Sequence, residues 1–349
     1  MLTPNNKRGT TIPAIRNGTY QHIFSLGVAG HVIVNHVDRE ILLIDPWPSY
    51  ERGKFDVFPG KVDKHGMKRL EALVNFLRRS VGEGYRLVGV LLSHEHFDHV
   101  DDIRRIYSLL CREEGRRRID RGTFRTAGPR LAENQLPPAY GDRDTVEAVF
   151  DKPVLGCTPA CFEITLRGGS LRYADGYNRR LPKSRRCKAG VPADPFDLGH
   201  FRIEPYVWDH WNVGDNTAEA RLFISGGLQR QSAFVISRRR LREAKRTLIS
   251  GSAGEMHREF TGEGLVRQMR PRLSVDVLVT AITGAGGSLD AMVSYQKRNI
   301  SVRDTIVCSH FDDFLALRGG PSSTTEFLDA RKAGNFHRVK DYLEALTRV

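Results

Sequence analysis

The sequence of 349 residues contains no run of about eighteen apolar residues without a charge, which is the shortest stretch expected of a membrane-spanning helix. Its first residues, MLTPNNKRGTTIP, lack the basic segment followed by an apolar segment that marks a secretory signal. The sequence therefore predicts a protein that neither spans a membrane nor is exported.

Cysteine is also scarce. The chain has five cysteines, an odd number and a low one for this length. They are Cys111, Cys157, Cys161, Cys187 and Cys308. Such a set favours reduced thiols over a disulfide framework, because disulfides are typical of exported proteins. We therefore expect a cytoplasmic protein.

Composition excludes a disordered chain, since 40% of the residues are hydrophobic and 27% are charged. There is no internal repeat of fixed period. We expect a single domain over 1–349, with its core at about 20–318. An arginine-rich insertion is expected at about 115–190, and a helical tail at 319–349.

The formal net charge of +13 is concentrated in three segments. Residues 112–130, 167–188 and 221–246 hold seven, eight and eight Lys or Arg against three, one and one Asp or Glu. Such a surface attracts anions, so a small anionic substrate is expected, with a nucleic acid or an acidic lipid surface left open. A solvated basic face is the plainer interpretation. The basic residues do not alternate with aromatic ones as in RNA-binding modules.

Alternating and clustered apolar residues predict the main elements. A hairpin is expected between about 20 and 45, a helix at 67–80, a strand at 86–93 and a helix from about 100 to 114. The second half predicts strands at 201–208, 220–227, 232–237, 246–250, 275–282 and 304–309, with helices at about 262–270 and 288–299. This mixture indicates the α+β class.

The strongest motif follows the predicted strand at 86–93. It reads SHEHFDHVD and places His94, His96, Asp98 and His99 within six positions. Three imidazoles this close would repel one another when protonated, whereas neutral imidazoles and a carboxylate are preferred ligands of Zn²⁺. His94 and His96 can face one ion and Asp98 and His99 another, so the loop predicts two half-sites.

Each half-site needs a further protein ligand, which must come from another strand end. Two histidines have the right context. His210 lies in YVWDHWNVGDN, just beyond the predicted strand 201–208, and His310 lies in IVCSHFDDF, just beyond the strand at 304–309. Either one alone could be an ordinary loop histidine, but together they complete the cluster.

The order of these segments resembles the metallo-β-lactamase superfamily, from about residue 20 to 318. Gly30-His31 with ILLIDPWPS resembles the opening of its lactonase-like and N-acylphosphatidylethanolamine phospholipase D-like branch. SHEHFDHVD, DHWNVGDN and SHFDDF resemble its three histidine segments. The resemblance implies a four-layer αββα sandwich. It implies one metal bound by His94, His96 and His210, and another bound by Asp98, His99 and His310.

One segment departs from the superfamily pattern. Relatives usually offer a bridging aspartate after a strand, whereas this chain has LISGSAGE, with Ser252 at that place. A neutral serine neither bridges two cations nor offsets their charge, so we expect the second metal to bind more weakly. One or two Zn²⁺ ions are expected, with Mn²⁺ as the alternative metal.

The expected chemistry is hydrolysis by a metal-bound hydroxide, with Asp98 and His310 as the candidate catalytic residues. Asp45, which ends a predicted strand, is expected to orient a ligand histidine rather than to bind metal itself. Three functions remain open. The first is a hydrolase of an ester, lactone or amide, the second is a phosphodiesterase acting on a nucleotide, nucleic acid or phospholipid, and the third is a metal-binding scaffold without catalysis.

Overall fold

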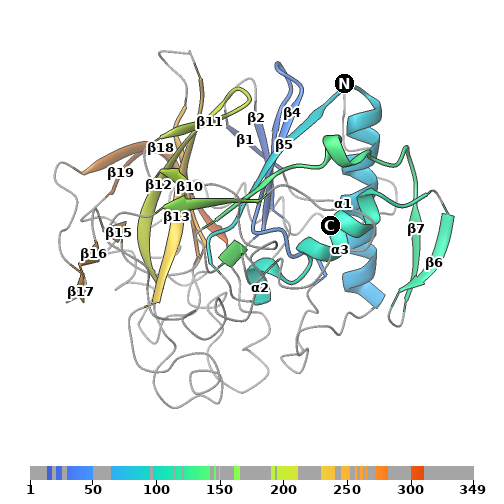
Figure 1. Ribbon diagram of the computed structural model, residues 1–349. Helices are drawn as coiled ribbons and strands as arrows, with labels where there is room; N and C mark the ends of the chain where they lie inside the picture. The colour runs from blue at the N-terminus through green and yellow to red at the C-terminus, as the bar shows by residue number, and fades with distance from the viewer. Residues whose placement is uncertain are drawn as a thin grey trace, which may run out of the picture.

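A computed structural model describes most of the two predicted sheets and the helices beside them (Figure 1). The described residues are 14–17, 21–25, 30–49, 64–94, 97–113, 115–119, 122–141, 145–146, 149, 161–165, 190–192, 195–210, 229–239, 245–251, 256–257, 260–261, 264–265, 272–281 and 300–309. Among these residues, no helix has the length and apolar character needed to cross a membrane.

The first sheet has eight strands in the order β1-β2-β3-β4-β5-β8-β9-β10. Their bounds are β1 Ala14–Asn17, β2 Gln21–Ser25, β3 His31–Asn35, β4 Glu40–Ile44, β5 Arg86–Leu91, β8 Ala139–Gly141, β9 Cys161–Thr165 and β10 Gly190–Pro192. Strands β1 to β4 pair antiparallel, and the pairs from β4 to β10 are parallel. The carboxyl ends of β4 and β5 therefore lie at the same edge.

The second sheet has the order β11-β12-β13-β14-β18-β19, with β15 paired to β12. The bounds are β11 Phe196–Leu198, β12 Phe201–His210, β13 Gln229–Arg238, β14 Thr247–Ser250, β15 Met256–His257, β18 Leu273–Ala281 and β19 Ile300–Ser309. Strands β14, β18 and β19 run parallel, and β12 runs in the same direction because β13 is antiparallel to both β12 and β14.

The two sheets pack face to face through alternate apolar side chains. Ile33, Leu42 and Leu91 of the first sheet share one buried cluster with Phe234 and Val279 of the second. Because successive side chains of a strand point to opposite faces, their neighbours Leu43 and Val90 lie on the outer face of the first sheet. The core is thus a β-sandwich.

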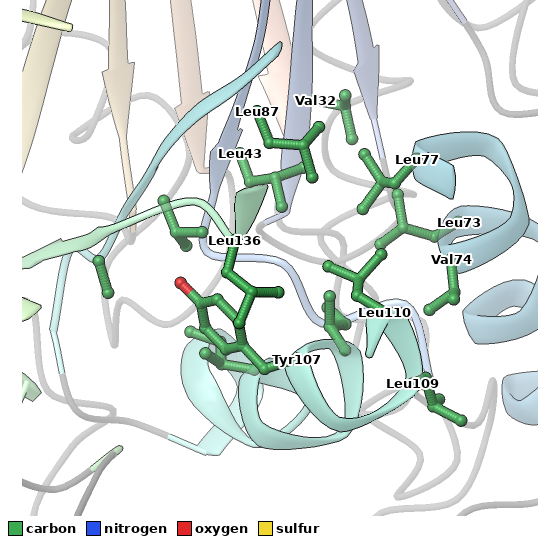
Figure 2. Close-up of a cluster of buried hydrophobic side chains, with 14 of the residues drawn as sticks. Val32, Leu43, Leu73, Val74, Leu77, Leu87, Tyr107, Leu109, Leu110 and Leu136 are labelled. Carbon is green, nitrogen blue, oxygen red and sulfur yellow. The ribbon is translucent and has the colours of Figure 1, made fainter. Parts of the chain in front are cut away.

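Two helices cover that outer face. They are α1 (Lys64–Gly82) and α3 (Ile103–Leu110), with the single turn α2 (Phe97–Val100) before α3. Figure 2 shows Leu73 and Leu77 of α1 on the side of the helix that faces Leu43 and Leu87 of the sheet. These residues repeat at the helical spacing predicted for 67–80, which gives α1 its apolar face.

The α+β class and the layers helix, sheet, sheet are as predicted. The outer face of the second sheet is buried as well, through Val235, Leu248 and Leu278. The helix expected at 288–299 lies outside the described residues. The helix expected at 262–270 is wrong at its start, because β16 (Phe260–Thr261) and β17 (Gly264–Leu265) pair as short antiparallel strands, and 266–270 lies outside the described residues.

The arginine-rich range is more regular than its composition suggested. Strands β6 (Gly115–Ile119) and β7 (Gly122–Thr126) form a hairpin that stands on the far side of α1 from the sheets (Figure 1). Strands β8, β9 and β10, from the same range and its border, join the first sheet. The limits of the domain and of the insertion remain predictions.

Charged groups join the sheets at the edge away from the carboxyl ends of β4 and β5. The buried carboxylate of Glu40 accepts a hydrogen bond from the backbone amide of His200 at 2.7 Å. Asp38 pairs with Arg238 through two bonds of 2.8 and 3.1 Å. Gly199 has a φ of +60°, and a Cβ there would collide with the Glu40 carboxylate. Position 199 therefore requires glycine.

Arg78, on α1, is fully buried and donates hydrogen bonds to several backbone carbonyls. Its Nε donates to Pro129 at 2.9 Å, Nη1 donates to Arg112 at 2.8 Å and Leu109 at 3.3 Å, and Nη2 donates to Gly128. The guanidinium thereby holds the carboxyl end of α3 against α1.

We predict that Arg78→Met lowers the free energy of unfolding by about 3 kcal/mol, because buried carbonyls lose their donors. The measurement is equilibrium unfolding in urea. Arg79→Met, at the exposed neighbouring position of the same helix, is the control and should change stability by less than about 0.5 kcal/mol. Equal effects of the two substitutions would contradict this role for Arg78.

Candidate metal centre

The candidate centre lies where β4 and β5 end. Asp45 directly follows β4, and Ser93 and His94 follow β5. The backbone amide of Asp45 donates to the carbonyl of Leu91 at 3.0 Å, which holds the two strand ends together. His31, on the neighbouring strand, is paired in register with Ile44 and is fully buried.

The carboxylate of Asp45 joins this edge to the histidine motif. Its Oδ1 accepts from the Ser93 amide at 2.7 Å, and its Oδ2 accepts from the Ser93 hydroxyl at 2.5 Å. The same Oδ2 lies 3.0 Å from Nδ1 of His99. Asp45 has a φ of +43°, a left-handed backbone that few residues other than glycine adopt. The chain thus accepts backbone strain to direct this carboxylate at the motif.

The rings of His94 and His99 are fully buried and nearly touch, with centroids 4.0 Å apart. The Ser93 hydroxyl lies 2.9 Å from Nδ1 of His94 and 3.3 Å from Nδ1 of His99. One proton arrangement satisfies these contacts, with the hydroxyl donating to Asp45 and both Nδ1–H groups donating to Ser93 or Asp45. A metal at either ring would then be bound through Nε2.

Backbone topology brings the second sheet to the same edge. The amide of Ser232, on β13, donates to the carbonyl of Ser93 at 2.8 Å and so joins the two sheets beside the motif. In register, Tyr206, Ala233 and Ser250 form one row across β12, β13 and β14. The Ser250 hydroxyl lies 3.4 Å from the hydroxyl of Thr280 on β18, and Thr280 is in register with Cys308 of β19.

The expected ligands of the second sheet follow that row along the chain. His210 is the last residue of β12, and His310 comes directly after β19. Ser252 comes two positions after the end of β14. Because β12, β14 and β19 run in the same direction, their carboxyl ends share one edge. This placement concerns the backbone alone.

The structure describes part of the predicted ligand set. Side chains are described for His94 and His99, and the backbone alone for Asp98, in α2, and for His210. His96, Ser252 and His310 lie outside the described residues. Among the described residues, no three potential ligands converge on one point. The metal-ligand set and the catalytic roles of Asp98 and His310 therefore remain predictions, whereas Asp45 does contact a motif histidine.

A second polar contact was not expected from the sequence. Ser49, at the end of the segment DPWPS, donates its amide to Oδ2 of Asp102 and its hydroxyl to Oδ1, both at 2.7 Å. Arg105 reaches Oδ1 of the same carboxylate at 3.0 Å. The bonds of Ser93 to Asp45 were likewise not expected from the sequence, although Ser93 belongs to the motif. Serine in a loop carries no signal of such a partner, because its hydroxyl bonds to many kinds of group.

Asp102 is fully buried, and this burial raises the pKa of its carboxyl to about 6. The charge of Arg105 and the hydrogen bonds from Ser49 oppose the rise without cancelling it. The carboxyl therefore changes its charge close to neutral pH, although its Ser49 and Arg105 contacts suit the ionised form.

The described donors suit a divalent metal. Neutral imidazoles with Nδ1 bonded to a serine or a carboxylate are the form in which histidine usually binds zinc. The motif combines histidine nitrogens with a carboxylate, which suits Zn²⁺. Mg²⁺ and Ca²⁺ prefer ligand sets made of oxygen atoms alone. Through their contacts with Nδ1, Ser93 and Asp45 therefore leave Nε2 of His94 and His99 as the ring atom suited to a metal.

Comparison with known proteins gives a resemblance to solved structures only. No protein-family model and no curated protein sequence matches the chain. Unliganded yeast PDE1 is 10% identical, covering 90% of this chain and 95% of that one, with a TM-score of 0.43. A "possible metal-dependent hydrolase" from Veillonella parvula DSM 2008 is 11% identical, covering 86% of each chain, with a TM-score of 0.36.

The metallo-β-lactamase GOB-18 from Elizabethkingia meningoseptica is 13% identical, covering 99% of this chain and 97% of that one. Its TM-score is 0.33. Likenesses at these identities and TM-scores say nothing about individual residues of this chain. The geometry of Asp45, Ser93, His94 and His99 comes from this structure and does not depend on those likenesses.

We predict that Asp102 makes the protein more stable as the pH falls from about 6 to about 4. In this window the folded protein binds a proton that the unfolded chain, with an aspartate pKa of 3.8, does not bind. Asp102→Asn should remove this contribution, as seen by urea unfolding of metal-free protein across the window. Asp101→Asn is the control, because Asp101 is a partly exposed carboxylate that also pairs with Arg105. A wild-type pH dependence in Asp102→Asn would contradict the prediction.

Proposed function

We propose that this protein is a metal-dependent hydrolase of the metallo-β-lactamase fold that acts on an ester, lactone or amide of a small anionic molecule. The observation that supports it is the pair of buried imidazoles, His94 and His99, held by Ser93 and Asp45 at the edge where the two sheets meet. Buried histidines arranged in this way are typical of metal sites.

In this proposal His94, His96 and His210 bind one metal, and Asp98, His99 and His310 bind a second. A bound divalent metal would supply a Lewis acid and a water of lowered pKa. Asp98 would act as a general base that takes up a proton on a carboxylate oxygen. Asp45 and Ser93 keep the rings of His94 and His99 in place while this occurs.

Ser252 distinguishes the two metals. Because it offers no charge where a bridging aspartate would stand, the second metal binds more weakly than the first. Zn²⁺ is the expected ion, with Mn²⁺ as the alternative. The protein therefore works with one tightly held metal and a second whose occupancy depends on metal supply.

The substrate class is argued from charge. A net charge of +13, carried largely by arginine, favours an anionic molecule in solution. The same charge favours the alternative function, a phosphodiesterase acting on a nucleotide, nucleic acid or phospholipid. A non-catalytic metal-binding scaffold is the third function to be tested.

We predict that the protein purified without added metal contains one or two zinc ions per chain, measured by elemental analysis. His96→Ala should lose this metal and lower hydrolysis by at least about 100-fold, more than the loss of a merely supporting residue. His36→Ala is the control, because His36 bonds to Tyr85 at 3.0 Å at the opposite end of β3. Full metal content and turnover in His96→Ala would refute the proposed ligand set.

A substrate panel separates the three functions. We predict turnover of p-nitrophenyl esters or of lactones, with little turnover of bis(p-nitrophenyl) phosphate, because the proposed reaction is acyl transfer to water. The opposite preference would favour the phosphodiesterase. Metal binding without turnover of either class would favour the scaffold.

A further inference from the structure

The segment from Asp45 to Ser49 contacts the histidine motif at both of its ends. At its start, the Asp45 carboxylate bonds to Ser93 and His99. At its end, Ser49 bonds through its amide and its hydroxyl to Asp102, which lies three positions after His99. Residues 93–102, which include the whole motif, are therefore held at both ends by a segment of five residues.

This short segment is stiff. Two of its residues, Pro46 and Pro48, have a fixed φ, and Asp45 occupies the left-handed region. The carbonyl of Pro48 also accepts a bond of 2.8 Å from Nε of Arg69, on α1. Since Ser49 is only 3% exposed, water does not compete for its contact with Asp102.

Asp102 uses its side chain for this contact and not for capping α3. It occupies the N-cap position of α3, where an aspartate usually bonds to a free backbone amide of the first turn. Here its side chain makes no capping bond, and both of its oxygens are used by Ser49. The backbone of Asp102 is helical, with φ −83° and ψ −10°, rather than extended as at most N-caps, so its carboxylate is available to the segment 45–49.

We propose that Ser49 and Asp102 are positioning residues that clamp the histidine motif and set the place of His99 relative to Asp45. This inference deepens the proposed function and rests on it for the identity of the ligand. Loss of the clamp releases the end of the motif that contains Asp98 and His99, and leaves the Ser93–His94 end attached through Ser93 and Ser232. The effect should therefore fall mainly on the second, weaker metal.

The test measures Zn²⁺ affinity by competition with a chromophoric chelator. Asp102→Ala removes both bonds to Ser49, and Ser49→Ala removes one of them, so the dissociation constant of the second zinc should rise by about 10- to 100-fold, more in Asp102→Ala. In the double variant the effect should equal that of Asp102→Ala alone, because both substitutions break the same contact.

Arg78→Met is the matched control. Arg78 bonds to the carbonyls of Leu109 and Arg112 at the carboxyl end of α3, whereas Asp102 holds its amino end, next to the motif. It should lower stability and leave zinc affinity unchanged. If Asp102→Ala and Arg78→Met affect zinc affinity equally, Asp102 has a structural role only and the proposal is overturned. Should Asp102→Ala fail to fold, the milder Ser49→Ala decides.

A second measurement needs no metal. The ¹⁵N shifts of the His99 ring report whether Nδ1 keeps its bond to Asp45, and the clamp predicts that Ser49→Ala and Asp102→Ala alter them while Arg78→Met does not. If the wild-type protein binds no zinc, the proposed function fails. The ring shifts still test the clamp, because they are measured without metal. Unchanged His99 shifts in both clamp variants would overturn it.

Discussion

Inside the sandwich edge, out of contact with solvent, one oxygen of Asp45 lies within hydrogen-bonding distance of both the Ser93 hydroxyl and the His99 ring. This three-way contact fixes the direction of two imidazoles at once, because Ser93 also meets His94. A carboxylate buried in this way is costly unless its oxygens are bonded. The surrounding fold places the hydrogen-bond partners of this carboxylate. The parallel ends of β4 and β5 place Asp45 beside Ser93, and the amide of Ser232 holds Ser93 to the second sheet.

Much of the fold could be predicted from apolar spacing. The helix at 67–80 and the strands near 86–93, 201–208 and 275–282 were predicted because each has a long, regular apolar face, and α1, β5, β12 and β18 occupy those places. The error at the start of the range 262–270 concerned a segment with few apolar residues, where β16 and β17 have two residues each. Spacing gives no helix or strand signal at that length.

The site could be predicted only as far as its residue types were unusual. Three histidines and an aspartate in six positions are rare, so the motif was found, and Asp45 was expected beside it because it ends a strand. Ser93 and the Ser49–Asp102 contact were not predicted. Serines and aspartates are common in loops and at helix starts, and the pairing of residues 53 positions apart depends on the course of the chain.

The left-handed backbone at Asp45 restricts which amino acids the position can tolerate. Glycine adopts such a φ freely, and asparagine and aspartate adopt it more readily than β-branched and bulky residues do. Of these three, aspartate alone offers a negatively charged acceptor for a serine hydroxyl and an imidazole. Glutamate retains the charge but adopts a positive φ less readily. Aspartate therefore meets both demands of position 45, whereas asparagine would keep the shape and lose the charge.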